Sequence, residues 1–182
     1  MLRYLKTMKT LALSFSSEQR DAQLVGFSDS DWGGDRDDRK STSGYVFTIG
    51  GTAISWKSKK QAVVALSSTE AEYIGTSEAT REAIWLQHLL LEITESNHPT
   101  YLQLLFVDNQ GAIKPGENPR FHERTKHIDI KYHFDQQAYE NGPITVQYIS
   151  TSNMTADIMT KTLPTECHWI HLAGMGLSFK IV

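Results

Sequence analysis

The sequence predicts a mixed α/β domain, in which one β-sheet carries helices on its faces. Three strand-like segments joined by tight turns come first, and a long helical segment follows them. Two later strand-like segments are separated by connections long enough for crossovers. With 182 residues, 40% of them hydrophobic and 21% charged, the chain fits one globular domain with an ordinary core. The expected order of the elements is βββ-α-β-α-β-α.

Residues 1–22 look like an annex to this domain. An apolar and basic segment runs from Arg3 to Phe15, and serines and charged residues follow it as a linker. The segment is consistent with a short helix plus a strand, or with the remnant of a preceding domain.

The first three strands form a predicted antiparallel meander. Leu24–Asp29 is a compact apolar run that ends in an acid, which is typical of a buried strand. Its two-residue period puts Asp29 and Asp31 on one face, so the period alone does not choose between them. Gly44–Ile49 and Thr52–Lys57 are the next two strands, joined by a Gly-Gly turn.

The long helix is expected from about Ser67 to Glu95. Ser67 and Thr69 are both candidate N-caps, with Glu70 and Glu72 three residues after them as capping-box partners. At 100° per residue, Glu72 lies on one stripe with the apolar side chains of Ala79, Ala83, Leu86 and Leu90.

That stripe should face the core, and Glu70, Glu78 and Glu82 lie off it, where surface glutamates belong. A core-facing carboxylate is costly unless a nearby cation needs it, so Glu72 is a candidate metal ligand. The alternative is that Glu72 only caps the helix.

The second half contains two more strands. Leu102–Asp108 is another buried strand that ends in aspartate, and Ile144–Ile149 alternates clearly. Between them, prolines allow only a short helix in residues 112–125, and residues 126–141 fit a strand or a helix equally well. Ser150–Asn153 is a turn that leads into a predicted helix over Met154–Leu163, which carries Asp157. Residues 165–182 are expected to be a loosely packed tail.

Bulk composition excludes several classes of protein. The single Cys167 excludes a disulfide framework and a cysteine-rich zinc site. The sequence has no apolar run long enough for a bilayer and no signal-peptide pattern at its start, so we expect a cytoplasmic protein that does not contact membranes. A net charge of -3 argues mildly against a nucleic-acid partner. Basic clusters at Lys57, Lys59 and Lys60 and at Arg36, Arg39 and Lys40 weaken that objection.

Four acids from different elements form the candidate site: Asp29, Glu72, Asp108 and Asp157. Carboxylates that meet in one place repel one another unless cations neutralise them. They are hard oxygen ligands and select Mg²⁺ or Mn²⁺. Two such ions about 4 Å apart suit phosphodiester cleavage. No P-loop, nucleophile elbow or His-Glu-x-x-His helix is present to support another chemistry.

Six segments, in this order, closely resemble the ribonuclease H domain of copia-type retrotransposon Pol polyproteins. They are Gly26–Trp32 (GFSDSDW), Lys40–Phe47 (KSTSGYVF), Ser68–Tyr73 (STEAEY), Asp108–Ile113 (DNQGAI), Arg124–Asp129 (RTKHID) and Ala156–Lys161 (ADIMTK). The resemblance covers residues 23–164. Residues 1–22 resemble the end of the upstream reverse transcriptase region, and residues 165–182 follow the domain as a tail.

The resemblance implies a ribonuclease H fold, with a five-stranded mixed sheet in the order 3-2-1-4-5. It also implies two Mg²⁺ ions, with Mn²⁺ as a substitute, and hydrolysis of the RNA strand of RNA–DNA hybrids during reverse transcription. In this family the first-strand acid matches Asp29, the helix acid matches Glu72, and the last-helix pair matches Asn153 and Asp157. Asp108 matches the acid of the fourth strand. The implied partner is the reverse transcriptase domain of the same polyprotein, and the implied location is the cytoplasm, within virus-like particles.

Hybrid recognition is expected to act on sugar and phosphate, with the RNA strand identified by its 2′-hydroxyls. Candidate contacts lie beside the acids, on the basic strand and near a histidine cluster: Ser68, Thr69, Asn109, Lys57, Lys59, Lys60, Trp56 and His127. The sequence departs from the family at two places. The loop before the last helix has no histidine, and Lys114-Pro115-Gly116 interrupts an expected helix.

Two other functions fit the same sequence. One is a catalytically silent module of this fold that binds nucleic acid or braces a polymerase, for which the acidic pI of about 6.1 and the departure at Pro115 leave room. The other is a sister nuclease that cuts DNA, against which the copia-like segments argue.

Overall fold

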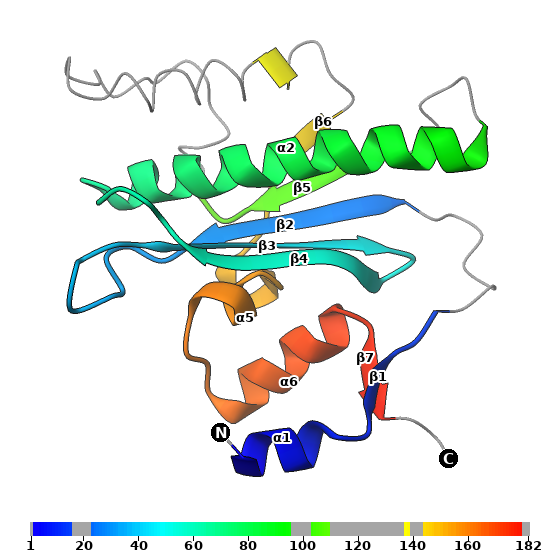
Figure 1. The fold of residues 1–182 in the computed structure, drawn as a ribbon, viewed down its shortest axis with the longest axis horizontal. Coiled ribbons are helices and arrows are strands. Elements are labelled where there is room, and N and C mark those ends of the chain that lie inside the picture. Colours follow the sequence, from blue (N-terminus) through cyan, green and yellow to red (C-terminus); the bar gives the residue numbers. More distant parts are fainter. Residues whose placement is uncertain (1, 16–22, 96–102, 110–136, 139–143, 180–182) are drawn as a thin grey trace.

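A five-stranded mixed sheet forms the centre of the protein in the computed structural model, which describes residues 2–15, 23–95, 103–109, 137–138 and 144–179 (Figure 1). Its strands are β2 (Leu24–Ser30), β3 (Thr42–Ile49), β4 (Thr52–Lys60), β5 (Gln103–Val107) and β6 (Ile144–Tyr148). They lie in the order β4-β3-β2-β5-β6. Counted along the chain, that is the predicted order 3-2-1-4-5.

The predicted meander is confirmed. The pairs β2–β3 and β3–β4 are antiparallel, whereas β2–β5 and β5–β6 are parallel. Gly50 and Gly51 turn the chain between β3 and β4 with φ of 56° and 73°. Because side-chain-bearing residues rarely adopt such angles, two glycines suit this turn.

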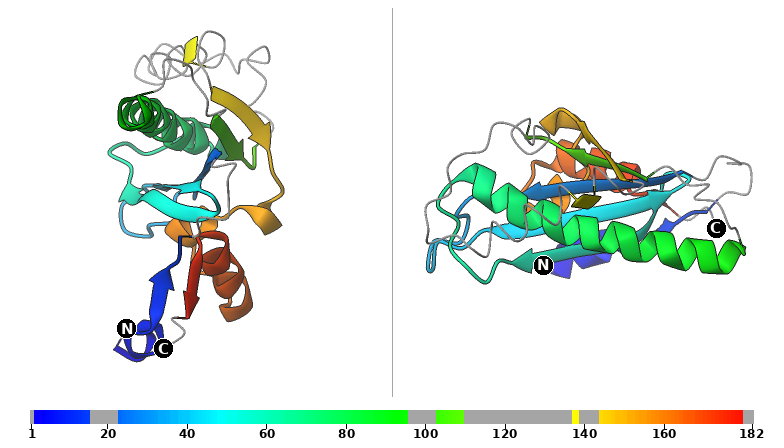
Figure 2. Two further views of the ribbon diagram at one scale, coloured as in Figure 1. Left: turned by 90° about the vertical axis from the view of Figure 1, so that its right-hand side faces the viewer. Right: turned by 90° about the horizontal axis from the view of Figure 1, so that it is seen from above.

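Helix α2 (Ser68–Thr94) covers one face of the sheet, and α5 and α6 lie on the opposite face (Figures 1 and 2). Ala79, Ala83 and Leu86 of α2 are at most 3% exposed. They pack against Leu24 and Phe47 of the sheet in the main core cluster. The predicted apolar stripe of this helix is therefore the face that it buries.

The start of α2 corrects one expectation. The Ser67 side chain accepts a hydrogen bond from the Glu70 amide (3.1 Å), and the Glu70 carboxylate accepts one from the Leu66 amide (2.9 Å). Glu70 is only 5% exposed, so its predicted surface position is wrong: its side chain folds back over the helix terminus. Glu70 is the capping carboxylate, and Glu72 is left for another role.

The last predicted helix is much shorter than expected. The chain forms a 3₁₀ turn, η2 (Thr151–Asn153), and then one turn of α-helix, α5 (Asp157–Thr160), in place of a helix over Met154–Leu163. Met154 is buried in an extended conformation, and Lys161 is extended at the other end. The Ser58 hydroxyl also donates to the Met159 carbonyl (2.6 Å), which links this short helix to β4.

Residues 165–179 are not a loosely packed tail. They form α6 (Thr165–Gly174) and β7 (Leu177–Phe179), and Leu172 and Met175 are 7% and 6% exposed. An amphipathic helix followed by a strand has apolar side chains to bury, which explains the difference.

The annex at the start of the chain contains a short helix and a strand, as one of the two interpretations expected. These are α1 (Leu2–Met8) and β1 (Leu11–Leu13), and β1 pairs antiparallel with β7 (Figure 1). The amide of Ala53 donates to the Met175 carbonyl (2.9 Å) and so links this small sheet to β4. The domain boundaries at residues 22 and 164 stay a prediction.

Several expectations fall outside the described residues. They are the short helix within residues 112–125, the ambiguous segment 126–141 apart from residues 137–138, and His127. Among the helices that are described, none combines the length and apolar character of a membrane span.

Candidate metal centre

The sheet topology brings two of the predicted acids together. Asp29 lies near the end of β2, and Asp108 directly follows β5. These strands are parallel neighbours in which Ser28 pairs with Val107, so both acids lie at the same edge of the sheet. Carboxyl ends of parallel strands commonly form ligand sites in α/β folds.

Asp157 reaches this edge from α5, on the face opposite α2. One carboxylate oxygen from each of Asp29, Asp108 and Asp157 lies within 4.8 Å of the others. Within the described part of the chain, this is the one group of acids, histidines or cysteines so arranged. Three hard oxygen donors at this spacing fit Mg²⁺ or Mn²⁺.

A glycine in β3 allows α5 to approach so closely. Gly44 pairs with Asp29 in the β2–β3 register. A Cβ atom on Gly44 would lie 2.5 Å from Met159 Cβ and 2.8 Å from Thr160 Cγ2. Any other residue would therefore push α5, and Asp157 with it, away from Asp29.

The carboxylates are buried and have polar partners. Asp29 and Asp157 are 3% and 4% exposed. The Lys161 ammonium lies 3.0 Å from Asp29 Oδ1 and 2.8 Å from Asp157 Oδ1. The hydroxyl of Thr160 hydrogen-bonds the second oxygen of Asp29, and that of Thr151 donates to Asp108 Oδ2 (3.1 Å). Buried charges need such pairing to be tolerated.

Burial shifts the pKa values at the site. It raises the pKa of Asp157, and the hydrogen bond from Lys161 opposes that rise. Burial alone would lower the pKa of Lys161, but Asp157 and Asp29 outweigh it, so that pKa lies above its ordinary value. Lys161 therefore carries its positive charge at any physiological pH.

Glu72 faces the same centre from the first turns of α2. Its pKa is raised to about 8, chiefly by burial and further by the negative charges of Asp108 and Asp29. A hydrogen bond from Asn109 acts in the opposite direction. Glu72 is not one of the three acids that meet within 4.8 Å, so it lies at the margin of the cluster.

A buried polar network fixes the start of α2 against the sheet. Gln61 is 4% exposed, and its amide nitrogen donates to Ser43 Oγ (2.7 Å) and to the Ala71 carbonyl (2.8 Å). The Ser30 hydroxyl donates to Ser43 (3.2 Å). Because Ala71 adjoins Glu72 in the chain, this network sets where the Glu72 carboxylate can lie.

The predicted substrate contacts fall into two groups, of which the first adjoins the acids. Ser68 is exposed and Thr69 half-buried in the first turn of α2, and Asn109 is half-buried beside Asp108. All three lie close in sequence to acids of the proposed centre, and their role as substrate contacts stays a prediction.

The basic group on β4 is divided between the two faces of the sheet. Lys57 pairs with Glu78 of α2 (3.0 Å). Lys60 pairs with Asp35 and Asp38. Strand alternation puts the exposed Lys59 on the face of Lys57, and Trp56 on the other face. Trp56 there lines a cavity with side chains of α5 and α6. The phosphate-binding role of this group stays a prediction.

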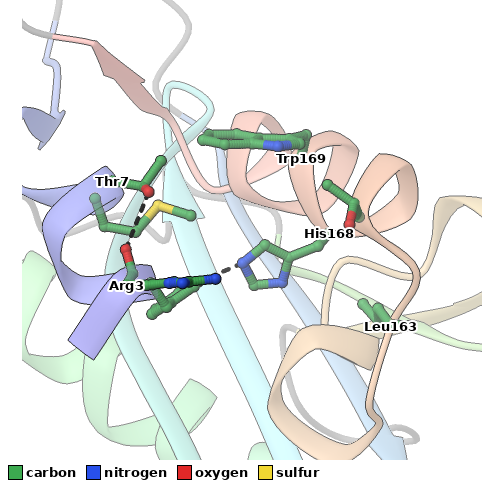
Figure 3. A pocket seen from close by; sticks show the side chains of 8 residues that line it. Arg3, Thr7, Leu163, His168 and Trp169 are labelled. Carbon is green, nitrogen blue, oxygen red and sulfur yellow. Dashed lines mark hydrogen bonds between the residues drawn. The ribbon is translucent and has the colours of Figure 1, made fainter. Parts of the chain in front are cut away.

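A separate cavity of about 400 Å³ lies between α1 and α6 (Figure 3). Arg3, His168 and Trp169 line it, and Tyr4 Oη lies 3.2 Å from His168 Nε2. None of the clustered acids lines this cavity, so it is distinct from the carboxylate centre.

The sequence interpretation missed Lys161, Thr160 and Thr151. A signal for Lys161 was present, because it follows Asp157 by four residues, the spacing at which helical side chains meet. The hydroxyls gave no such signal, since they contact acids that are far away in the sequence.

Known proteins are similar to this chain in sequence and in fold. No protein-family model matches the chain. It is 43% identical, over 90% of its length, to the retrovirus-related Pol polyprotein from transposon TNT 1-94 of Nicotiana tabacum. It is 40% identical, again over 90%, to the corresponding polyprotein from transposon RE2 of Arabidopsis thaliana. The chain spans only 12% and 11% of the length of these relatives.

Solved structures identify the fold. LC11-RNase H1, solved in complex with an RNA/DNA hybrid, superposes with a TM-score of 0.53 at 13% identity, over 76% of this chain and 94% of that one. The chain is therefore similar to one segment of retrovirus-related Pol polyproteins from plant transposons, and it has the ribonuclease H fold.

Proposed function

We propose that the protein is a metal-dependent endoribonuclease that hydrolyses the RNA strand of RNA–DNA hybrids. The observation that carries this proposal is the meeting of Asp29, Asp108 and Asp157 within 4.8 Å at one edge of the sheet. The ribonuclease H fold and the hybrid bound to one structural neighbour support the substrate class.

The proposed centre takes two Mg²⁺ ions, held by Asp29, Glu72, Asp108 and Asp157. Bound ions of this kind activate water for attack on a phosphodiester and stabilise the leaving oxygen. Asp29 and Asp157 are nearly fully buried and supply fixed ligands, whereas Asp108 and Glu72 are half-buried and border the solvent side. The chain's own contribution is thus a rigid carboxylate pair with two more accessible acids beside it.

Ser68, Thr69 and Asn109 border the acids and are the proposed contacts to the RNA strand. Their hydroxyl and amide groups can bond the 2′-hydroxyl, the group that distinguishes RNA from DNA. Lys57, Lys59, Lys60 and Trp56 are the proposed contacts to the DNA strand, with His127 as a further phosphate contact. In this proposal residues 23–164 form the nuclease domain, which works beside the reverse transcriptase of the same polyprotein, in cytoplasmic virus-like particles.

A second candidate function is a catalytically silent module that binds nucleic acid or braces a polymerase. The pairing of Lys161 with both Asp29 and Asp157 favours it, because this ammonium neutralises part of the acidic centre without any metal. The two candidates differ in whether RNA is cut.

Strand-specific cleavage tests the proposal. The protein is incubated with Mg²⁺ and an RNA–DNA hybrid labelled on either strand, beside Asp108→Asn and the matched control Asp37→Asn, which alters an exposed acid of the β2–β3 loop. We expect cuts in the RNA strand alone, lost in Asp108→Asn and kept in Asp37→Asn. Folded protein that leaves the RNA intact with both Mg²⁺ and Mn²⁺ would contradict the nuclease and favour the silent module.

A further inference from the structure

Lys161 inserts a positive charge into the centre of the acid cluster. Its Nζ atom lies 3.0 Å from Asp29 Oδ1 and 2.8 Å from Asp157 Oδ1, so one ammonium joins two carboxylates from distant parts of the chain. The side chains of these acids are 2% and 6% exposed. Two buried carboxylates side by side repel strongly, and Lys161 is the cation that the chain itself provides between them.

Two further donors to the cluster come from the same segment. Thr160 hydrogen-bonds the other oxygen of Asp29, and Thr151 donates to Asp108. Residues 151–161 thus supply a cation and two hydroxyls to acids on β2, on α5 and after β5. These are the interactions that stabilise a carboxylate cluster with no metal in it.

We propose that Lys161 is the built-in counter-cation of the metal centre: its ammonium occupies the position between Asp29 and Asp157 in the metal-free protein, and Mg²⁺ must displace it. The inference rests on the proposed function, because it takes these acids as metal ligands. It adds a competition between lysine and metal for the same two oxygens.

The side chain of Lys161 is suited to such an exchange. It is 33% exposed, whereas the carboxylates that it joins are almost fully buried. Lysine carries a compact charge on a flexible four-carbon stem, so its head can turn to solvent while its stem stays packed. The cost of separating the ammonium from two carboxylates then weakens Mg²⁺ binding and sets the Mg²⁺ concentration at which the centre fills.

Metal titration of a Lys161→Met variant tests the competition. Mg²⁺ affinity is measured by isothermal titration calorimetry, and thermal unfolding is followed with and without Mg²⁺. Charges about 4 Å apart interact strongly in a partly buried site, so we expect Mg²⁺ to bind on the order of tenfold tighter in the variant. The metal-free variant should unfold at a lower temperature, and Mg²⁺ should raise that temperature more than in the wild type.

Two further variants make the result specific. Lys9→Met removes an exposed lysine beside α1 and should leave Mg²⁺ affinity unchanged. Lys161→Gln keeps a hydrogen-bond donor without the charge, so it should also bind Mg²⁺ more tightly, and it serves in place of Lys161→Met if that variant does not fold.

The outcomes separate this inference from the proposed function. Unchanged or weaker Mg²⁺ binding in the folded Lys161 variants, beside a wild type that binds Mg²⁺, overturns the competition and leaves the metal centre standing. Absence of Mg²⁺ binding in the wild type and in the Lys161 variants overturns the metal centre and the nuclease proposal together. Mg²⁺ binding by the Lys161 variants but not by the wild type supports the competition, because it would mean that Lys161 excludes the metal at the concentrations tested.

Discussion

Gly44→Ala should damage the acid centre without touching an acid. The added Cβ atom would lie 2.5 Å from Met159 Cβ, whereas ordinary contacts begin near 3.4 Å. Helix α5 must therefore move by about 1 Å, and Asp157 and Lys161 move with it, away from Asp29. Overpacking of this kind costs about 1–3 kcal/mol of unfolding free energy. A misplacement of about 1 Å in a catalytic constellation costs about 100-fold in rate.

A glycine elsewhere provides a control for lost stability. Gly51 has φ of 73° and no atom within 4 Å of its would-be Cβ, so Gly51→Ala strains the backbone by about 1 kcal/mol at the opposite end of β3. Thermal unfolding, Mg²⁺ titration and RNA cleavage are measured on both variants. We expect both proteins to be destabilised but Gly44→Ala alone to lose Mg²⁺ affinity and cleavage. Wild-type Mg²⁺ binding by Gly44→Ala would refute the argument that this glycine positions α5.

Two other substitutions test the start of α2. Glu72→Gln should stabilise the metal-free protein at high pH. The pKa of Glu72 is raised from 4.5 in the unfolded chain to about 8 in the folded protein. Between these pH values the unfolded chain releases a proton that the folded wild type keeps, so the wild type loses stability as the pH rises. Solvent that reaches this carboxylate reduces the effect, so we expect Glu72→Gln to raise the free energy of unfolding by about 2 kcal/mol at pH 9 and by almost nothing at pH 4, measured by urea unfolding. Equal increases at both pH values would contradict this reasoning. Ser67→Ala should remove the N-cap bond to Glu70 and cost about 1 kcal/mol in the same assay, whereas loss of the neighbouring exposed hydroxyl in Ser68→Ala should cost much less.

The architecture was predictable wherever burial follows a simple period. β3 and β4 were indicated by β-branched and aromatic residues on either side of a Gly-Gly turn, and the stripe on α2 depends on one packed face, which a hydrophobic pattern records directly. The two apolar runs that end in acids indicated buried strands, whereas the pairing of β2 with β5 was implied only by the strand order of the family that the sequence resembles. The pattern failed at α5, where the backbone is extended at Met154 and at Lys161, on either side of one helical turn. The contacts of this segment come from distant residues, such as the hydrogen bond from Ser58, about a hundred residues away in the chain.

The sequence indicated the acids that meet at the site, but not the side chains that hydrogen-bond and pair with them. The stripe argument selected Glu72, whose pKa is raised by the negative charges of Asp108 and Asp29. It left Glu70 on the surface, because a helical projection cannot show a side chain that folds back to cap its own helix. Thr160 and Lys161 contact Asp29 across 131 and 132 residues, and only the tertiary fold brings them together.

The parallel pairing of β2 with β5 also has a consequence for the order of folding. β2 and β3 are close in sequence, so their hairpin can form early, whereas β5 joins β2 only after a loop of about 70 residues closes, which is entropically slow. The pocket of negative charge is therefore absent from any intermediate in which only the hairpin is formed. A cation that binds there would bind the completed sheet and not its precursors, and would slow unfolding far more than it would speed folding.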